Sequence, residues 1–286
     1  MLVAWAQIVE AAEVRLVQAD GSELRLPAPA ARVIALSPHL TEGVFAAGAG
    51  PQLIATVEYS EYPVAAIDVP RVGDAFRLDV ERIVALRPDL VVAWESGNPR
   101  PAIEQLRRLN QMVWTVEIRT PEGIPAFVES VGRATGHASE AEAEANRLRD
   151  RLSSLERRYV NANTVRYFYQ VDAKPLFTIN GQHLISDGLA RCGGVNIFGE
   201  EPGLAFQVSR ESVIVADPEA ILAPRLPGAA DPLAAWRDWP GLAAVRNQAL
   251  FLLPADEISR ATPRFLDSLD TACSLLQGLR EKSGHE

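Results

Sequence analysis

The feature that most constrains the fold of this chain is a sequence pattern that occurs twice, about half a chain apart. Residues 79–94 contain a short helical segment, a proline-bearing turn and a run of apolar residues typical of a buried strand. Residues 211–223 repeat this order at an offset of 130 residues, so that Glu81 corresponds to Glu211. A repeat of this length predicts two similar lobes with a cleft between them.

The length and composition agree with two domains of ordinary size. A chain of 286 residues with 48% apolar and 23% charged residues can form two cores of about 130 residues each. The net charge is −9 and the lysines and arginines form no run, which argues against nucleic-acid binding because phosphates require clustered cations. No segment of 18 apolar residues occurs, so the sequence predicts no membrane-spanning helix.

The first residues have two open interpretations. Residues 1–9 are apolar except for Gln7, and Val9 and Ala11 are small residues at the two positions that a signal peptidase reads. The basic region that normally precedes such a segment is missing. The segment is therefore either an incomplete secretory signal, whose remainder would lie upstream of Met1, or a mildly apolar tail.

Strand-like apolar segments alternate with helix-like segments along the chain, a pattern typical of parallel sheets in α/β lobes. In the first lobe we expect strands at 33–36, 53–56, 90–93 and 112–116. In the second lobe we expect strands at 165–170 and 220–223. The predicted fold class is α/β, with two similar Rossmann-like lobes.

The segment between the two lobes has a composition of its own. Residues 139–158 are rich in Glu, Arg, Ala and Leu and contain neither glycine nor proline, which predicts one long helix of about 30 Å. Such a helix would join the lobes rigidly, unlike a glycine-rich linker. The predicted domains are an N-terminal tail and hairpin (1–31), a first lobe (32–136), the linking helix (137–160) and a second lobe (161–286).

Catalytic and metal-binding motifs are absent from the sequence. It contains no nucleophile elbow, phosphate-binding loop or zinc-protease motif, and its four histidines are scattered. These absences disfavour an enzyme. Cys192 and Cys273 lack the spacing of a metal or redox motif, and they are either a disulfide in an oxidising compartment or two buried thiols.

Aromatic and charged residues stand where open α/β sheets bind ligands, beyond the carboxyl ends of the strands. The residues at such strand-end or following-loop positions are His39, Tyr59, Trp94, Phe177, Asp256 and Arg260. Together they predict a large, flat, mainly apolar ligand with amide or carboxylate edges. A single aromatic residue is usually a core residue, but six residues at these positions favour a ligand wall.

Several motifs resemble one family over most of the chain, from about residue 32 to 279. In the first lobe they are Val-Ile-Ala-Leu-Ser-Pro (33–38), Phe-Ala-Ala-Gly (45–48), Tyr-Ser-Glu-Tyr-Pro (59–63), the segment 81–94 and Gly-Asn (97–98). In the second lobe they are Cys-Gly-Gly (192–194), Asn-Ile-Phe (196–198), Gln-Val-Ser-Arg-Glu (207–211) and Arg-Ala-Thr-Pro-Arg (260–264). With these motifs the chain resembles the periplasmic cobalamin-binding proteins of the BtuF type, within the siderophore, haem and cobalamin class of binding proteins for ABC importers.

The resemblance implies a function and a set of binding residues. A protein of this class captures cobalamin or a related corrinoid in the cleft between its lobes, in the periplasm, and delivers it to an ABC importer without a reaction or a catalytic cofactor. By this resemblance Tyr59, Trp94 and Phe177 would lie against the corrin ring. Asp256 and Arg260 would form a polar pair near the ligand.

The resemblance also implies two pairs of residues outside the binding site. Cys192 and Cys273 would form a disulfide. Glu81 and Glu211 would be exposed carboxylates that bind arginines of the two-fold permease dimer, one from each lobe. The simpler interpretation of these glutamates is a solvated carboxylate at each helix start. We expect the binding protein itself to be a monomer.

Three positions depart from the family's aromatic pattern. Phe76 lies where the family commonly has a tryptophan just before the helix that carries Glu81. Another tryptophan position falls on Ala205, next to Phe206, and a third aromatic position falls on Val171. We expect Phe76 and Phe206 to replace part of the missing ring area. The smaller rings predict weaker cobalamin binding or a preference for a corrinoid such as cobinamide.

His39 stands at a position that is small in the familiar member of this family and faces the predicted cleft. It could approach the cobalt or donate a hydrogen bond to a corrin amide, or it could be a polar residue at a helix start. The closest alternative function keeps the fold and binds haem, with Tyr59 or His39 as axial ligand. A ferric siderophore fits less well, because it requires several cations and only Arg260 is placed. A remote alternative is an enzyme or metal-cofactor scaffold.

Overall fold

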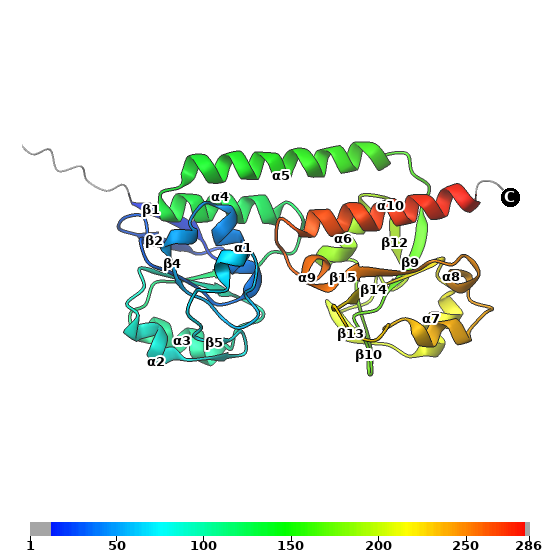
Figure 1. Cartoon of the computed structure of the whole chain (residues 1–286), viewed down its shortest axis with the longest axis horizontal. Helices are drawn as coiled ribbons and strands as arrows, with labels where there is room; N and C mark the ends of the chain where they lie inside the picture. Colours follow the sequence, from blue (N-terminus) through cyan, green and yellow to red (C-terminus); the bar gives the residue numbers. More distant parts are fainter. Residues whose placement is uncertain (1–12, 284–286) are drawn as a thin grey trace, which may run out of the picture. The chain divides into compact units, whose positions relative to one another are not determined.

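The computed structural model describes residues 13–283, so the predicted signal-like segment at residues 1–9 lies outside the described residues. The chain divides into two compact units (Figure 1). Unit 1 contains the chain up to Glu117 together with Phe127–Glu144, and unit 2 contains Ile118–Ala126 and the chain from Ala145 onward. The division falls within the segment 137–160 that was predicted to link the lobes, and it places Ile118–Ala126 in unit 2.

The sheet of unit 1 has four parallel strands in the order β4-β3-β7-β8. They are β3 (Val33–Ala35), β4 (Leu53–Ala55), β7 (Leu90–Trp94) and β8 (Val113–Val116). Nearly all their side chains are apolar because helices cover both faces of the sheet. The four predicted strands of the first lobe are confirmed.

Two pairs of helices cover the sheet of unit 1 (Figure 1). On one face α2 (Val80–Ala85) and α3 (Arg100–Arg108) bury Ile83 and Leu106 against the strands. On the other face Phe127 of α4 (Gly123–Thr135) packs on Trp114, with ring centroids 5.6 Å apart. α1 (Pro38–Ala46) packs closely beside α4 at Gly43. A side chain larger than hydrogen at this position would overlap the ring of Phe127.

Unit 2 repeats this arrangement with the strand order β12-β9-β14-β15. The strands are β9 (Val165–Tyr169), β12 (Gly194–Asn196), β14 (Ala220–Arg225) and β15 (Leu250–Pro254). Numbered by their order along the chain, the strands lie across each sheet in the same spatial order, 2-1-3-4. The predicted fold class of two similar Rossmann-like α/β lobes is therefore confirmed.

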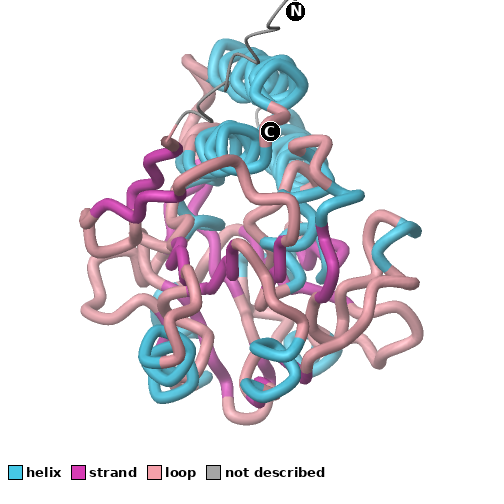
Figure 2. The backbone as a smooth tube through the Cα atoms, turned by 90° about the vertical axis from the view of Figure 1, so that its left-hand side faces the viewer, coloured by secondary structure: helices cyan, strands magenta, loops and turns pink. Residues whose placement is uncertain are grey.

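Helices also lie on both sides of the strands of unit 2 (Figure 1), as they do in unit 1, which faces the viewer in Figure 2. One face is covered by α7 (Arg210–Ala216), α8 (Ala243–Arg246) and the 3₁₀ helix Ala234–Asp238, which buries Trp236. The other face is covered by α6 (Leu184–Ala190) and α10 (Phe265–Ser283). A buried disulfide joins Cys192, after α6, to Cys273 of α10, with the Cα atoms 5.7 Å apart. The predicted pairing is confirmed.

The repeat extends to the turns before β7 and β14. In unit 1 the guanidinium of Arg32 donates to the carbonyl oxygens of Leu86 and Arg87, at 2.6 and 3.1 Å. In unit 2 Arg166 donates to the corresponding carbonyl oxygens of Ala216 and Asp217 at the end of α7, at 2.5 and 3.4 Å. Arg87 and Asp217 both have left-handed backbone, with φ of 49° and 41°. The same arginine contact therefore ends the same helix in each unit.

Three small antiparallel sheets complete the fold. The predicted N-terminal hairpin is confirmed as β1 (Val14–Val17) and β2 (Glu23–Leu26), with Gly21 at a φ of 82° in its turn. β5 (Gly73–Asp74) pairs with β6 (Arg77–Leu78). The third sheet has β10 (Asp172–Ala173), β11 (Leu176–Ile179) and β13 (Ala205–Gln207).

The predicted connecting helix is α5 (Ala138–Tyr159), which has 22 residues and divides between the units after Glu144. The structure adds a second connection, the segment Ile118–Ala126, which belongs to unit 2 although β8 and most of α4 belong to unit 1. No helix between residues 13 and 283 is long and apolar enough to cross a membrane.

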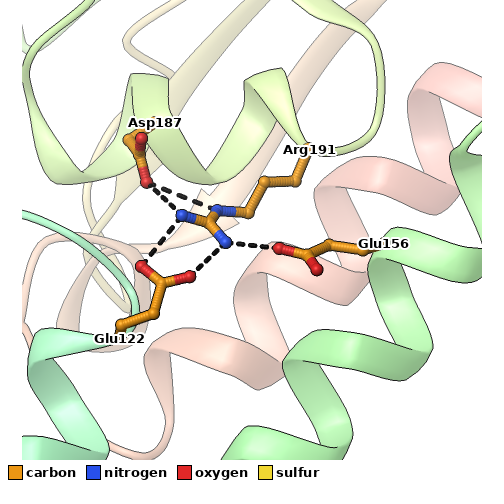
Figure 3. A network of polar contacts seen from close by, with 4 residues as sticks. All are labelled: Glu122, Glu156, Asp187 and Arg191. Carbon is orange, nitrogen blue, oxygen red and sulfur yellow. Dashed lines mark hydrogen bonds and ion pairs between the residues drawn. The ribbon is translucent and has the colours of Figure 1, made fainter.

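One arginine of unit 2 holds both connections (Figure 3). The guanidinium of Arg191 contacts Asp187 one turn earlier in the chain at 2.8 Å, Glu122 of the second connection at 2.9 Å and Glu156 of α5 at 2.5 Å. The side chain of Arg191 is 18% exposed, and burial alone would lower its pKa. Hydrogen bonds with Asp187 and Glu122 outweigh burial and raise the pKa of Arg191.

Candidate ligand-binding site

Trp94 is the last residue of β7, and its indole is fixed on two sides. The ring of His39 lies edge-on to it, with centroids 5.1 Å apart and an interplanar angle of 87°. On another side the backbone of Gly97 approaches so closely that a Cβ atom there would lie 1.9 Å from the indole. Trp94 and His39, both predicted site residues, therefore form one rigid wall at the carboxyl edge of the unit 1 sheet.

Asn98 organises the loops around this wall. Its side chain is buried, its Oδ1 accepts from the amide of Trp94 at 2.7 Å, and its Nδ2 donates to the carbonyl oxygens of Leu36 and Ala75 at 2.9 Å each. One amide thus ties the ends of β3 and β7 to the loop that carries Phe76. The Gly-Asn pair at 97–98 was part of the family resemblance, but these hydrogen bonds could not be predicted from the motif.

Tyr59 lies on the loop after β4, and its side chain is 70% exposed. Its backbone is left-handed, with a φ of 66°, which costs a residue with a Cβ atom on the order of 1 kcal/mol. The next residue, Ser60, is buried, accepts a hydrogen bond from Thr56 at 3.0 Å, and its carbonyl accepts from Arg71 at 2.9 Å. The loop is therefore held in a conformation that leaves the Tyr59 ring in solvent.

Phe76 is also 70% exposed, between β5 and β6. The carboxylate of Asp74 accepts from the amides of Phe76 and Arg77 at 2.8 Å each, which fixes the turn that presents the ring. In unit 1 the rings of Tyr59 and Phe76 are therefore exposed on loops that hydrogen bonds hold in place.

The corresponding edge of unit 2 contains a pocket of about 530 Å³ where β9, β14 and β15 end. The predicted residues Asp256 and Arg260 both line it, and they form an ion pair at 2.9 Å. Val171, which replaces a family ring, lines it too and is 42% exposed. Arg225, the last residue of β14, is a further lining residue that the sequence reasoning missed, although it ends a strand that the repeat predicted.

Phe177, which was predicted at a strand-end or following-loop position, lies in β11 of the antiparallel sheet of unit 2, and Phe206 lies in β13 of the same sheet. Phe206 is opposite the buried Thr178, so it shares the face of Thr178, and Phe177 lies on the other face. The ring of Phe206 packs edge-on against Phe198, with centroids 6.3 Å apart. The structure therefore turns Phe206 toward the aromatic core and places the half-buried Phe177 on the opposite face, with Gln207 as its register partner.

Glu81 and Glu211 occupy the same position in the repeat, the second residue of α2 and of α7. Each helix begins with a side-chain cap, Asp79 in unit 1 and Ser209 in unit 2, which accepts from the amide three residues later. Both glutamates are exposed. Permease docking by these two glutamates stays a prediction.

Two other observations bear on where a ligand binds. Within residues 13–283 no three His, Cys, Asp or Glu side chains gather closely enough to hold a metal ion. A wider hollow of about 670 Å³ lies at the opposite edge of the unit 1 sheet, beside Pro88 and Met112, which precede β7 and β8. No aromatic residue lines it, so its size alone does not make it the site of a large flat ligand.

Comparisons with known proteins give the class. Residues 33–257 match the periplasmic binding protein family, and the chain belongs to this family. The vitamin B12-binding protein of Vibrio cholerae serotype O1 is 36% identical over 257 residues, which are 90% of this chain and 92% of that protein. The vitamin B12-binding protein of Photorhabdus laumondii is 39% identical over 191 residues, 67% of this chain and 70% of that one.

The solved structures agree with this assignment. The crystal structure of the periplasmic vitamin B12 binding protein BtuF of Vibrio cholerae has a TM-score of 0.81 and 35% identity, and the match covers 88% of this chain and 98% of that one. The haem-binding protein RhuT from Roseiflexus has a TM-score of 0.75 at 21% identity, which shows a shared fold only. The chain is thus a binding protein of a periplasmic family and not an enzyme.

Proposed function

We propose that this protein captures cobalamin or a related corrinoid and delivers it to an ABC importer. The observation that carries the proposal is the match to vitamin B12-binding proteins over 90% of the chain. The exposed rings of Tyr59 and Phe76, on ordered loops, support a large flat ligand. The protein acts as a monomer in the periplasm.

Both units contribute to binding. The rings of Tyr59, Phe76 and Trp94 supply apolar contact with the corrin, at about 25 cal/mol for each Å² removed from water. From unit 2, Phe177 adds a further ring. The Asp256–Arg260 pair lines the pocket with both donors and acceptors, which suits the amide-bearing edge of a corrinoid.

His39 is a hypothesis within this proposal. Its ring contacts Trp94, and its Nδ1 lies 2.9 Å from Ser37 Oγ, so any contact with the ligand uses the other side of the ring. We expect His39 to approach the cobalt or donate to a corrin amide. Replacing it with alanine should then shift the absorption spectrum of the bound corrinoid, and an unchanged spectrum would remove His39 from the site.

Delivery requires a docking surface for the importer. We assign this role to Glu81 and Glu211, because both are exposed and occupy equivalent positions in the repeat. Reversing both charges, with Glu81→Lys and Glu211→Lys, should abolish uptake by cells and leave the affinity for the corrinoid unchanged. A loss of affinity would show that these carboxylates belong to the binding site and not to docking.

The proposal is tested by calorimetric titration of the purified protein with cyanocobalamin, cobinamide and haemin. We expect saturable one-to-one binding of a corrinoid and no specific binding of haemin. Binding of haemin alone would replace the proposed function with haem transport and make Tyr59 and His39 the axial candidates. No binding of any of the three would refute the proposal and indicate another cargo.

A further inference from the structure

The pocket of unit 2 differs from the wall of unit 1 in the charges that line it. Two arginines, Arg225 and Arg260, and two carboxylates, Asp172 and Asp256, lie around about 530 Å³. The formal charges of these four side chains cancel. Such a pocket can still bind an anion if its carboxylates already have partners within the protein and one of its arginines does not. The contacts of each group therefore decide what the pocket can bind.

Both carboxylates are bound locally. Asp256 forms the ion pair with Arg260 at 2.9 Å. Asp172 accepts from its neighbours in the turn between β10 and β11, the amides of Ala173 at 2.6 Å and Lys174 at 3.3 Å. The negative charge of each carboxylate is therefore partly compensated by donors of the protein itself, without a ligand.

Arg225 has no such partner. Its side chain makes no hydrogen bond or ion pair with any residue of the described part of the chain, although it lines the pocket. The nearby Asp231 is already bound by Arg237 at 2.6 Å. Burial acts to raise the pKa of Asp231, but its hydrogen bonds and the charges of Arg237 and Arg225 lower it. Arg225 therefore helps to keep Asp231 ionised without being bound to it.

The position of Arg225 is well defined by its backbone. It ends β14 in register with Pro254 of β15. The loop that follows is held by Gln170, a buried residue after β9 whose Nε2 donates to the carbonyl oxygen of Pro232 at 2.8 Å. A guanidinium on a fixed strand end is suited to a planar, two-pronged contact with an anionic oxygen pair.

We propose that Arg225, together with Arg260, recognises an anionic group on the ligand, and that for a corrinoid this group is the phosphate of the nucleotide loop. The inference rests on the proposed function and makes Arg225 a residue that selects complete cobalamin over cobinamide, which lacks this phosphate. It reverses the sequence expectation that the smaller rings favour cobinamide.

The test is a titration of the full chain and of Arg225→Gln with cyanocobalamin, cobinamide phosphate and cobinamide. We expect the unsubstituted protein to bind the two phosphate-bearing corrinoids more tightly than cobinamide. Arg225→Gln should weaken those two by roughly tenfold, the effect of one partly exposed charge-assisted hydrogen bond, and leave cobinamide unchanged. Arg225 is exposed, so the variant should fold, and its melting curve verifies this.

Arg237→Gln is the matched control, because Arg237 also acts on Asp231 but does not line the pocket. An equal loss with this control would show that order in the loop, and not contact with phosphate, is responsible. An equal loss of affinity for all three corrinoids in Arg225→Gln would also overturn the inference. So would an unsubstituted protein that binds cobinamide as tightly as the phosphate-bearing corrinoids. Both outcomes leave corrinoid binding itself in place. Failure to bind any corrinoid would refute the proposed function itself.

Discussion

Unit 1 and unit 2 hold their site loops by the same means but present different chemistry on them. In unit 1 the buried Asn98 makes three side-chain hydrogen bonds around the Trp94 wall. In unit 2 the buried Gln170 accepts from Trp236 Nε1 at 2.7 Å and donates to Pro232. The loops so held carry exposed rings in unit 1 and a charged pocket in unit 2. The two units therefore share a strand order but differ in the chemistry of the loops that follow the strands.

The largest effect should follow from breaking these anchors. Asn98→Ala removes three buried hydrogen bonds, and we expect the free energy of unfolding to fall by about 3 kcal/mol at roughly 1 kcal/mol each. Gln170→Ala removes two and should cost about 2 kcal/mol. Urea denaturation measures both, with Asn146→Ala on the exposed face of α5 as a control near zero. A smaller loss at Asn98 than at Gln170 would contradict the comparison.

The two units should also differ in their response to pH. α1 begins with Ser37, whose hydroxyl does not titrate, whereas the equivalent α6 begins with His183, whose Nδ1 accepts from Ile185 at 3.2 Å. Burial lowers the pKa of His183 from 6.5 to about 4. The unfolded chain therefore binds the proton first, so stability is lost as the pH falls from 6.5 toward 4. Between pH 7 and pH 5 this loss should be about 2 kcal/mol.

His183→Asn isolates this effect, because asparagine caps a helix but does not titrate. The variant should match the unsubstituted protein at pH 7 in urea denaturation and lose about 2 kcal/mol less between pH 7 and pH 5. Other groups titrate alike in both proteins and cancel in the difference. The same pH dependence in both would show that His183 does not control the stability of unit 2 in acid.

The wall of unit 1 can be disturbed without touching its rings. A methyl group at Gly97 must displace the Trp94 indole, so Gly97→Ala should weaken corrinoid binding by roughly tenfold, about 1.4 kcal/mol. Gly241→Ala in unit 2 is the matched control, because a Cβ atom there meets nothing within 4 Å. Calorimetry measures both affinities. An unchanged affinity in Gly97→Ala would mean that the position of the indole is not important for the ligand.

The sequence predicted those features that depend on short segments. Apolar strands, the N-terminal hairpin and the repeat of Glu81 at Glu211 are local signals, and the structure bears them out as structural features. The role of Asn98 could not be predicted, because its partners at Leu36 and Ala75 are distant in the sequence. Hydrogen bonds of this kind become visible only when the loops are placed together.

Two other features escaped prediction for related reasons. In the second connection between the units, Glu122 contacts Arg191, which lies 69 residues away in the sequence. The orientation of Phe206 depends on the register between β11 and β13, and a shift of one residue would reverse it. The family resemblance compensated for some of this, since it placed Asp256 and Arg260 together before any contact was known.

The smallest effect tests whether the repeated scaffold is equally strong in both units. Arg32→Ala and Arg166→Ala each remove two hydrogen bonds to the carbonyl oxygens that end α2 and α7. Both arginines are exposed, so we expect each change to lower the free energy of unfolding by only about 1 kcal/mol. The acceptors also differ in geometry, since the longer contact is 3.1 Å in unit 1 and 3.4 Å in unit 2. Urea denaturation should therefore show a loss of unfolding free energy for Arg32→Ala that equals or slightly exceeds the loss for Arg166→Ala. If only one of the two variants loses stability, the shared contact stabilises only the unit that carries it.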